Sequence, residues 1–425
     1  MNWEPAYALL LFASTFITFF ASIGMARYHS HKKAYIIVSI ILNLSILFFF
    51  KYFNWAAENV TIILSWLGIS MHVPEFKVLL PVGISFYIFQ ALGYSIDVYY
   101  GKVKVERNFF RYALFVSFFP QLVAGPIERS TNLLQQFYKK HSFSSDFAIN
   151  GCLMMLWGYF MKLVVADRVG LYVDSVYNNV NYHSGSSLAL ATILFSIQIY
   201  CDFAGYTYIA IGCARIMGFK LMDNFHRPYF STSVKDFWHR WHISFSTWLR
   251  DYVYIPLGGS RCSKLVNYRN LLLTFFISGI WHGAAWTFVI WGTIHGFCLI
   301  FEKIFNVKSE TKNIGKKICK ILSTFIIVNL AWIFFRANNL SDAIIVFKTI
   351  STTLFSSLFI DKTTLFYSFI GIFILLLGDI LLEYQIIKIN NKNHLLLFSM
   401  ASIFLISVIL LLGVFDGGQF IYFQF

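Results

Sequence analysis

The chain has 425 residues, of which 58% are hydrophobic, 20% aromatic and only 13% charged. Soluble proteins usually carry about 25% charged residues, and a soluble domain this poor in charge could not cover its surface. The composition therefore excludes an ordinary soluble protein. It predicts a bundle of membrane helices, because lipid accepts apolar side chains that face outward.

The formal net charge of +14 does not indicate a nucleic-acid-binding protein. The basic residues occur in short segments between apolar runs, as at residues 29–33 and 312–320. That distribution is typical of cytoplasmic loops under the positive-inside rule. Because no basic domain or recognition motif is present in the sequence, we expect no nucleic acid among the partners.

Apolar runs approaching the length of a membrane helix, about 20 residues, recur along the chain. The expected segments are, in order, Tyr7–Met25, Tyr35–Phe50, Val78–Tyr99, Tyr112–Ile127, Ile149–Val165, Ser187–Met217, Leu271–Phe301, Ile321–Phe335, Phe366–Leu382 and Leu395–Val414. Allowing for long and interrupted runs, we expect about nine to twelve transmembrane or re-entrant helices. The sequence predicts an all-α polytopic membrane protein with a single membrane-embedded domain over residues 1–425.

Two segments differ from plain spanning helices. Residues 222–270 mix charged and aromatic side chains, which predicts an amphipathic segment that lies at the interface or enters the bundle. The run Leu271–Phe301 would be about 45 Å long as one helix, against a hydrocarbon core of about 30 Å. Its two flanks are basic, which favours an even number of crossings. We expect a helix broken near residues 278–283 that places His282 at depth; a steeply tilted single helix is the alternative.

His282 is the strongest candidate for chemistry, because ionisable residues inside membrane segments are costly. It lies in GIWHGAAW, and no charged residue occurs between Leu271 and Phe301. Burial keeps an imidazole neutral, and a neutral imidazole can accept the proton of a hydroxyl that attacks an acyl carbon. The alternative is a core histidine hydrogen-bonded to a neighbouring carbonyl.

Other histidines admit a metal hypothesis. His295 cannot share a metal with His282 on a straight helix, and we interpret it as structural. Asp236, His239 and His242 are spaced i, i+3, i+6, so a helix would place them on one face with acceptable metal-ligand types. The alternatives are the polar face of an interfacial helix and a role in catalysis or acyl-donor binding.

Several further polar residues fall in apolar segments. Neighbouring opposite charges are more often structural pairs that lower the cost of burial. Such pairings are expected for Glu128 with Arg129 and for Lys162 with Asp167 and Arg168; Gln198 is a polar neighbour of Asp202. Asp202 is the most isolated of the charged residues, and we expect it as a candidate for lining a substrate tunnel.

Five blocks of sequence, in this order, carry a resemblance to a known family. They are PVGISFYIFQALGYSIDVYYG, FFPQLVAGPIER, IQIYCDFAGYTYIAIG, DFWHRWHISFSTWLRDYVYIPLGG and GIWHGAAWTFVIWG, between Pro81 and Gly292. The chain resembles the membrane-bound O-acyltransferase (MBOAT) family, in its bacterial branch of polysaccharide O-acetyltransferases of the alginate and peptidoglycan O-acetylation type. The D-alanyl transferase of teichoic acids is a cousin of this branch.

The resemblance implies a ring of helices around a central funnel, with a cytoplasmic acyl donor and an extracytoplasmic acceptor. It implies that His282 is the essential histidine and His242 the second catalytic one. His239 departs from the family pattern, which argues against a metal site; no metal is expected. Candidates for lining the tunnel are Asp202, Gln198, Trp281, Trp286, Arg240 and Ser244.

The resemblance also implies the partners and the location. The donor would be acetyl-CoA or another acyl thioester, with no tightly bound cofactor. The other expected partners are membrane lipid, a polysaccharide or cell-wall acceptor and an extracytoplasmic transferase, at the cell's cytoplasmic (inner) membrane. The aromatic C-terminal residues predict an interfacial anchor, or an acyl relay through the Tyr422 hydroxyl.

Two other functions remain open from the residues alone. A metal-dependent intramembrane hydrolase would use Asp236, His239 and His242. A glycolipid transporter or flippase would line a path with buried charges, although transporters often have repeat-related halves with paired broken helices and this sequence indicates one break. The sequence favours acyl transfer.

Overall fold

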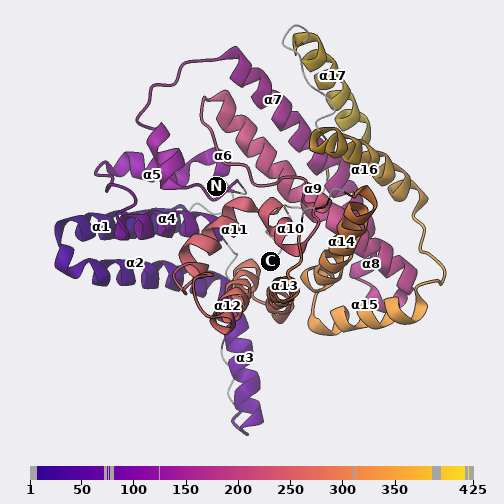
Figure 1. The fold of residues 1–425 in the computed structure, drawn as a ribbon, viewed down its shortest axis with the longest axis horizontal. Helices are drawn as coiled ribbons and strands as arrows, with labels where there is room; N and C mark the ends of the chain where they lie inside the picture. The colour runs from indigo at the N-terminus through magenta and orange to yellow at the C-terminus, as the bar shows by residue number, and fades with distance from the viewer. Residues whose placement is uncertain are drawn as a thin grey trace. The chain divides into compact units, whose positions relative to one another are not determined.

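The computed structural model describes residues 7–70, 74, 76, 81–123, 125–309, 311, 313–384, 394–416 and 420. Throughout those residues the regular elements are helices (Figure 1). Within them, seven helices are long and apolar enough to cross a membrane: Tyr7–Arg27, His29–Trp66, Ser145–Tyr177, Gly185–Ile216, Trp286–Ile304, Ile314–Arg336 and Lys362–Glu383. The prediction of an all-α, multi-pass membrane protein is confirmed, whereas the central funnel stays a prediction.

The chain divides into two compact units. The first comprises Met1–Ser142 with the short segments Phe219–Leu221 and Gly283–Ala285. The second comprises Phe143–Gly218, Met222–His282 and Trp286–Phe425.

The first unit begins with two long helices that pack side by side (Figure 1). They are α1 (Tyr7–Arg27) and α2 (Lys32–Leu47), and the Ser14 hydroxyl donates to Asn43 Oδ1 across them. A π-helical turn then carries α2 into α3 (Phe53–Trp66). The sequence prediction stopped at Phe50, because polar residues interrupt the apolar run after it. The helix α4 (Ile84–Tyr99) follows and is almost entirely buried.

One predicted spanning helix is wrong. Instead of a helix over Tyr112–Ile127, the chain forms α5 (Phe109–Ser117) and the single turn α6 (Phe119–Leu122). Proline in a helix interior lacks the N–H donor and clashes with the carbonyl four residues earlier. Pro120 therefore sits in the first turn of a new helix, after Phe118 has left the helical conformation (φ −58°, ψ 107°).

Two long helical segments pack together in the second unit. One runs from α7 (Ser145–Tyr159) through a π-helical turn (Phe160–Ala166) into α8 (Asp167–Tyr177), and the other is α9 (Gly185–Ile216). α7 and α9 lie side by side (Figure 1). A Cβ added at Gly158 would lie 2.6 Å from the Gly205 carbonyl oxygen. Small residues thus let the two backbones approach, as is common between membrane helices.

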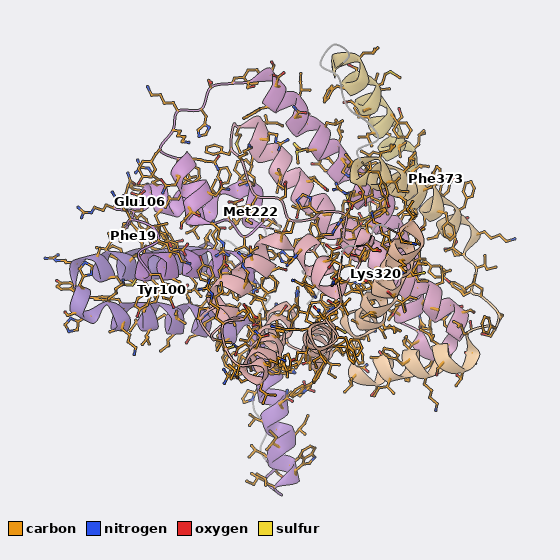
Figure 2. The ribbon with its side chains drawn as sticks, in the orientation of Figure 1. Phe19, Tyr100, Glu106, Met222, Lys320 and Phe373 are labelled. Carbon is orange, nitrogen blue, oxygen red and sulfur yellow. The ribbon has the colours of Figure 1, made fainter. Side chains whose placement is uncertain are left out.

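The remaining long helices of this unit are α14 (Ile314–Arg336), α15 (Leu340–Thr353), α16 (Lys362–Glu383) and α17 (His394–Leu412). On α16, Phe366, Phe369 and Phe373 are each more than half exposed, and Phe373 is labelled in Figure 2. Exposed aromatic side chains of this kind suit a helix that faces lipid.

The predicted break in the run Leu271–Phe301 is confirmed. Helix α12 (Lys264–His282) and helix α13 (Trp286–Ile304) are joined by three residues and pack as a hairpin. A Cβ at Gly279 would collide with the Phe288 carbonyl, and one at Gly292 with the Phe275 carbonyl. The two helices can therefore approach this closely only with glycine at these positions. The first half begins at Lys264, so it is longer than the apolar run indicated.

The segment 222–270 enters the bundle of the second unit. It forms a 3₁₀ turn (Pro228–Phe230), α10 (Val234–Arg240), α11 (Ile243–Leu249) and a π-helical turn (Arg250–Tyr254). Trp241, His242 and Phe245 within it are fully buried. Of the two placements that the sequence left open, the structure favours the second.

Candidate active site

His282 is the last residue of α12, and its side chain is buried at 2% exposure. Its ring centroid lies 4.8 Å from Trp291 and 5.4 Å from Phe335, both in edge-on geometry. Phe245 and Trp281 lie 5.6 and 5.0 Å away. The imidazole therefore sits among four aromatic side chains, which form an aromatic enclosure.

His242 lies between α10 and α11 and is fully buried. Burial lowers the pKa of its imidazole from 6.5 to about 3. Its ring stacks on Phe245 at 5.0 Å, and the Phe245 ring lies 5.6 Å from that of His282. The structure thus brings the two predicted catalytic histidines to one phenyl ring, although they are 40 positions apart in the sequence.

The backbone at His242 is strained. Its φ of 44° lies in the left-handed region, which residues other than glycine seldom adopt. Such strain persists only where the surroundings impose it, and it concentrates at functional sites. The cause here is local pairing, since the Ile243 N–H donates to the Asn224 carbonyl and the His226 N–H to the Arg240 carbonyl, both at 2.9 Å.

The helical face predicted for Asp236, His239 and His242 is wrong. Helix α10 ends at Arg240, and His242 leaves the helical conformation. Asp236 Oδ1 accepts from Arg240 Nε at 3.0 Å, and its other oxygen accepts from the Thr232 N–H. Within the described ranges, no three histidine, cysteine, aspartate or glutamate residues group as metal ligands.

Arg240 belongs to an ion-pair network at the end of α16. Glu383 accepts from Arg240 Nη1 at 2.9 Å and from Arg227 Nε at 2.7 Å. Arg227 is also left-handed, with a φ of 44°. One carboxylate thus holds Arg227 and Arg240, at the two ends of the segment that precedes His242; whether Arg240 also lines a substrate tunnel stays a prediction.

Asp202 is not the isolated charge that the sequence suggested. Lys162 Nζ lies 2.7 Å from Asp202 Oδ1 and 2.7 Å from Asp167 Oδ1. The expected Lys162–Asp167 pair is therefore confirmed. The sequence could not place Asp202 with them, because the π-helical turn that carries Lys162 meets α9 only in the fold.

Trp281 and Ser244 lie beside the histidines. The Trp281 ring stacks on Phe245 with a centroid distance of 4.1 Å. The Ser244 hydroxyl donates to Asn224 Oδ1 at 2.9 Å. Sequence reasoning missed Asn224 and Phe245, although both fall in the segment 222–270 that it singled out as unusual.

The remaining candidates are less clearly placed. Trp286 is 51% exposed at the start of α13, and Gln198 is partly buried on α9; their tunnel role stays a prediction. Tyr422 lies outside the described residues. The nearby Phe420 is fully buried, with its ring 4.5 Å from Tyr206 and 5.8 Å from Phe203.

His295 lies in the wall of the enclosure. It is fully buried on α13 and accepts from Trp238 Nε1 at 3.3 Å. The Trp291 ring is within 5.1 Å of both His295 and His282. These contacts agree with a packing role for His295.

A cavity of about 740 Å³ opens between the α10–α11 segment and the α12–α13 hairpin. Its charged and histidine lining residues are Lys235, His239, Arg250, Glu302 and Lys303. Ile243, next to His242, and Ser278, one turn before His282, also line it. The cavity thus adjoins the two elements that carry the candidate catalytic histidines, and its charge balance is positive.

Comparison with known proteins identifies the family to which the chain belongs. The sequence model of the membrane-bound O-acyltransferase family matches residues 103–341, more than half of the chain. The chain belongs to the MBOAT family. Both histidines and all the lining residues of the cavity fall inside the matched region.

Three relatives illustrate the branch. The probable alginate O-acetylase AlgI of Azotobacter vinelandii is 39% identical over 311 residues, 73% of this chain and 61% of that protein. The peptidoglycan O-acetyltransferase of Helicobacter pylori is 36% identical over 375 residues, 81% of this chain and 70% of the relative. The teichoic acid D-alanyltransferase of Bacillus subtilis is 29% identical over 246 residues, 55% and 62% of the two chains. The chain thus spans about three-fifths of the length of the alginate O-acetylase.

The buried charges around Lys162 generate a stability prediction. Replacing Lys162 by Met leaves two buried carboxylates without their shared cation, which should destabilise the fold by about 3–5 kcal/mol. The matched control is the triple variant Lys162→Met/Asp167→Asn/Asp202→Asn, in which no charge remains. Thermal melts in nanodiscs should show a large loss for the single variant and recovery in the triple. Equal melting temperatures for Lys162→Met and wild type would contradict a structural role for this cluster.

Proposed function

We propose that this protein is an O-acyltransferase of the cytoplasmic membrane. It moves an acyl group, acetyl by analogy with its O-acetylating relatives, from a cytoplasmic thioester to a hydroxyl group of an extracytoplasmic polysaccharide or cell-wall polymer. The observation that carries the proposal is the meeting of His282 and His242 at one aromatic cluster in a chain of the MBOAT family.

The chemistry requires one base. His282 accepts the proton of the acceptor hydroxyl while the oxygen attacks the thioester carbonyl carbon. The tetrahedral intermediate then collapses, the C–S bond breaks, and the leaving thiolate takes the proton from His282. The aromatic enclosure favours the neutral imidazole at the start of this cycle, and it excludes water that would hydrolyse the thioester.

The cavity beside the histidines suits the donor. CoA and phosphopantetheine thioesters are anionic, and Lys235, Arg250 and Lys303 give the lining a positive balance against Glu302. Positive clefts raise the local concentration of anionic ligands. The cavity reaches Ser278, one helical turn from His282, so a donor bound there would carry its thioester toward the base.

The acceptor and partners follow from the relatives. The names alginate O-acetylase and peptidoglycan O-acetyltransferase point to polymer hydroxyls. Because such polymers lie outside the cytoplasm, we propose an extracytoplasmic transferase partner. An acyl relay through Tyr422 would serve such a partner, and transfer retained in Tyr422→Phe would exclude the relay.

The alternative functions lose support from specific contacts. Asp236 is committed to Arg240 and to the Thr232 N–H, away from a joint metal site with His242. Asp202, one of the buried charges that a flippase path would use, is ion-paired with Lys162.

The proposed activity predicts CoA release from acetyl-CoA. Purified protein in nanodiscs should cleave the thioester, and His282→Ala should lower the rate by about 10²–10⁴-fold, the usual contribution of a general base. His295→Ala is the matched control, because this second buried histidine of the same hairpin packs without a proposed part in the reaction. Equal rates in wild type and His282→Ala would show that His282 is structural.

The donor site predicts a charge dependence. Lys235→Ala/Arg250→Ala should raise KM for acetyl-CoA by about tenfold, because two cations at the cavity are lost. The rate with S-acetyl-N-acetylcysteamine, which has no phosphate, should be unaffected. Lys348→Ala, at an exposed position of α15, removes a charge outside the cavity lining and serves as the control. A loss of equal size with both donors would place the anionic part of the donor elsewhere.

A further inference from the structure

Asn224 makes an unusual set of contacts at the base of the site. Its side chain is 1% exposed. Its Oδ1 atom accepts from the Ser244 N–H at 3.1 Å and from the Ser244 hydroxyl at 2.9 Å, and lies 3.1 Å from His242 Nδ1. One amide oxygen thus makes three contacts with two residues, His242 and Ser244.

These contacts fix the proton on His242. A backbone N–H can only donate, so the atom that faces Ser244 must be the carbonyl oxygen of the Asn224 amide and not its nitrogen. A carbonyl oxygen can only accept, so His242 Nδ1 must carry a hydrogen. In a neutral imidazole the lone pair is then on Nε2, on the other side of the ring.

The surroundings keep the ring neutral. Burial lowers the pKa of His242 to about 3. Phe203 of α9, Phe245 of α11 and Trp281 of α12 are among the rings packed on it, and these side chains carry no charge.

Asn224 also sets the backbone of His242. Its carbonyl oxygen accepts from the Ile243 N–H at 2.9 Å, directly after the left-handed residue. Asn224 therefore holds residues 242–244 through its main-chain carbonyl and through its side chain. A strained residue held by one neighbour in one tautomer is an arrangement that packing alone does not require.

We propose that Asn224 is a positioning residue for acyl transfer, which holds His242 in the Nδ1–H tautomer and so makes Nε2 the accepting nitrogen at the reaction centre. The inference rests on the proposed acyltransferase function. It assigns to His242 a definite part beside His282, namely a lone pair that accepts a hydrogen bond or proton from the reacting groups. The opposite tautomer would present an N–H donor at the same place.

Asn224→Asp separates positioning from packing. Asn224 Nδ2 has no hydrogen-bond partner among the described residues, so aspartate keeps all three contacts to Oδ1. Its negative charge beside the imidazole favours the protonated ring and raises the pKa of His242. Protonated His242 lacks the Nε2 lone pair, so activity should be lost on acidification at a higher pH than in wild type and return as the pH rises. We expect the acidic limb of the kcat/KM profile to move up by two pH units or more.

Two further variants complete the design. Asn329→Asp places the same change at a buried asparagine of α14 that binds the Ser196 hydroxyl, and its pH profile should match that of wild type. Asn224→Ala removes the acceptor and should lower kcat by about 10²-fold at every pH, in the range general acid–base groups contribute. Thermal melts show whether each variant is folded.

A direct measurement tests the tautomer without activity. Solid-state NMR of ¹⁵N-histidine-labelled protein, assigned by comparison with His242→Gln, should show His242 neutral and protonated at Nδ1. Loss of that preference is expected in Asn224→Ala. A ring protonated at Nε2 in wild type would overturn the inference.

The outcomes also separate this inference from the proposed function. If His282→Ala abolishes transfer while Asn224→Asp keeps the wild-type pH profile, the acyltransferase stands and the role of Asn224 is refuted. If wild type shows no transfer while NMR finds the Nδ1–H tautomer, the geometry stands and the proposed reaction fails.

Discussion

The close approach of α12 and α13 is the constraint on which the site depends. Without side chains at Gly279 and Gly292, each helix rests against a backbone carbonyl of the other. That packing allows the chain to reverse within three residues, so α12 ends at His282. It also brings Trp291 of α13 against the His282 ring. The Trp291 side of the aromatic enclosure is therefore a consequence of backbone packing between two helices, while α11 and α14 supply Phe245 and Phe335.

The second histidine is placed by a different device. His242 follows a short helix and is held in a left-handed conformation by pairing with residues 224–226. Glu383 forms ion pairs with Arg227 and Arg240, which lie at the two ends of the segment before His242. Phe245 connects the two histidines, because its ring contacts both imidazoles. The α12–α13 hairpin places His282, and backbone hydrogen bonds with residues 224–226 place His242 between α10 and α11. In both cases the main chain fixes the position of the histidine.

The sequence predicted the parts of this arrangement that depend on local chemistry. An apolar run too long for one crossing predicted the break beside His282, and apolar length predicted most long helices. The prediction of one helical face for Asp236, His239 and His242 was wrong, because spacing alone cannot reveal that a helix ends at Arg240. Asp202 seemed isolated because its partner Lys162 lies 40 positions earlier, on a π-helical turn. The cavity could not be predicted, since it is formed between segments that sequence reasoning treated separately.

Two groups of buried or partly buried charged side chains in the second unit are held in ion pairs. Asp236, Arg240, Glu383 and Arg227 form one network, while Lys162 holds Asp167 and Asp202 in another. The aromatic side chains that pack on His242 and His282 carry no charge. A carboxylate in contact with either imidazole would favour the protonated ring, which cannot accept a proton. An amide at position 224 orients His242 without that effect. Asparagine at position 224 thus meets two requirements together, since it fixes the tautomer of His242 and leaves that imidazole uncharged.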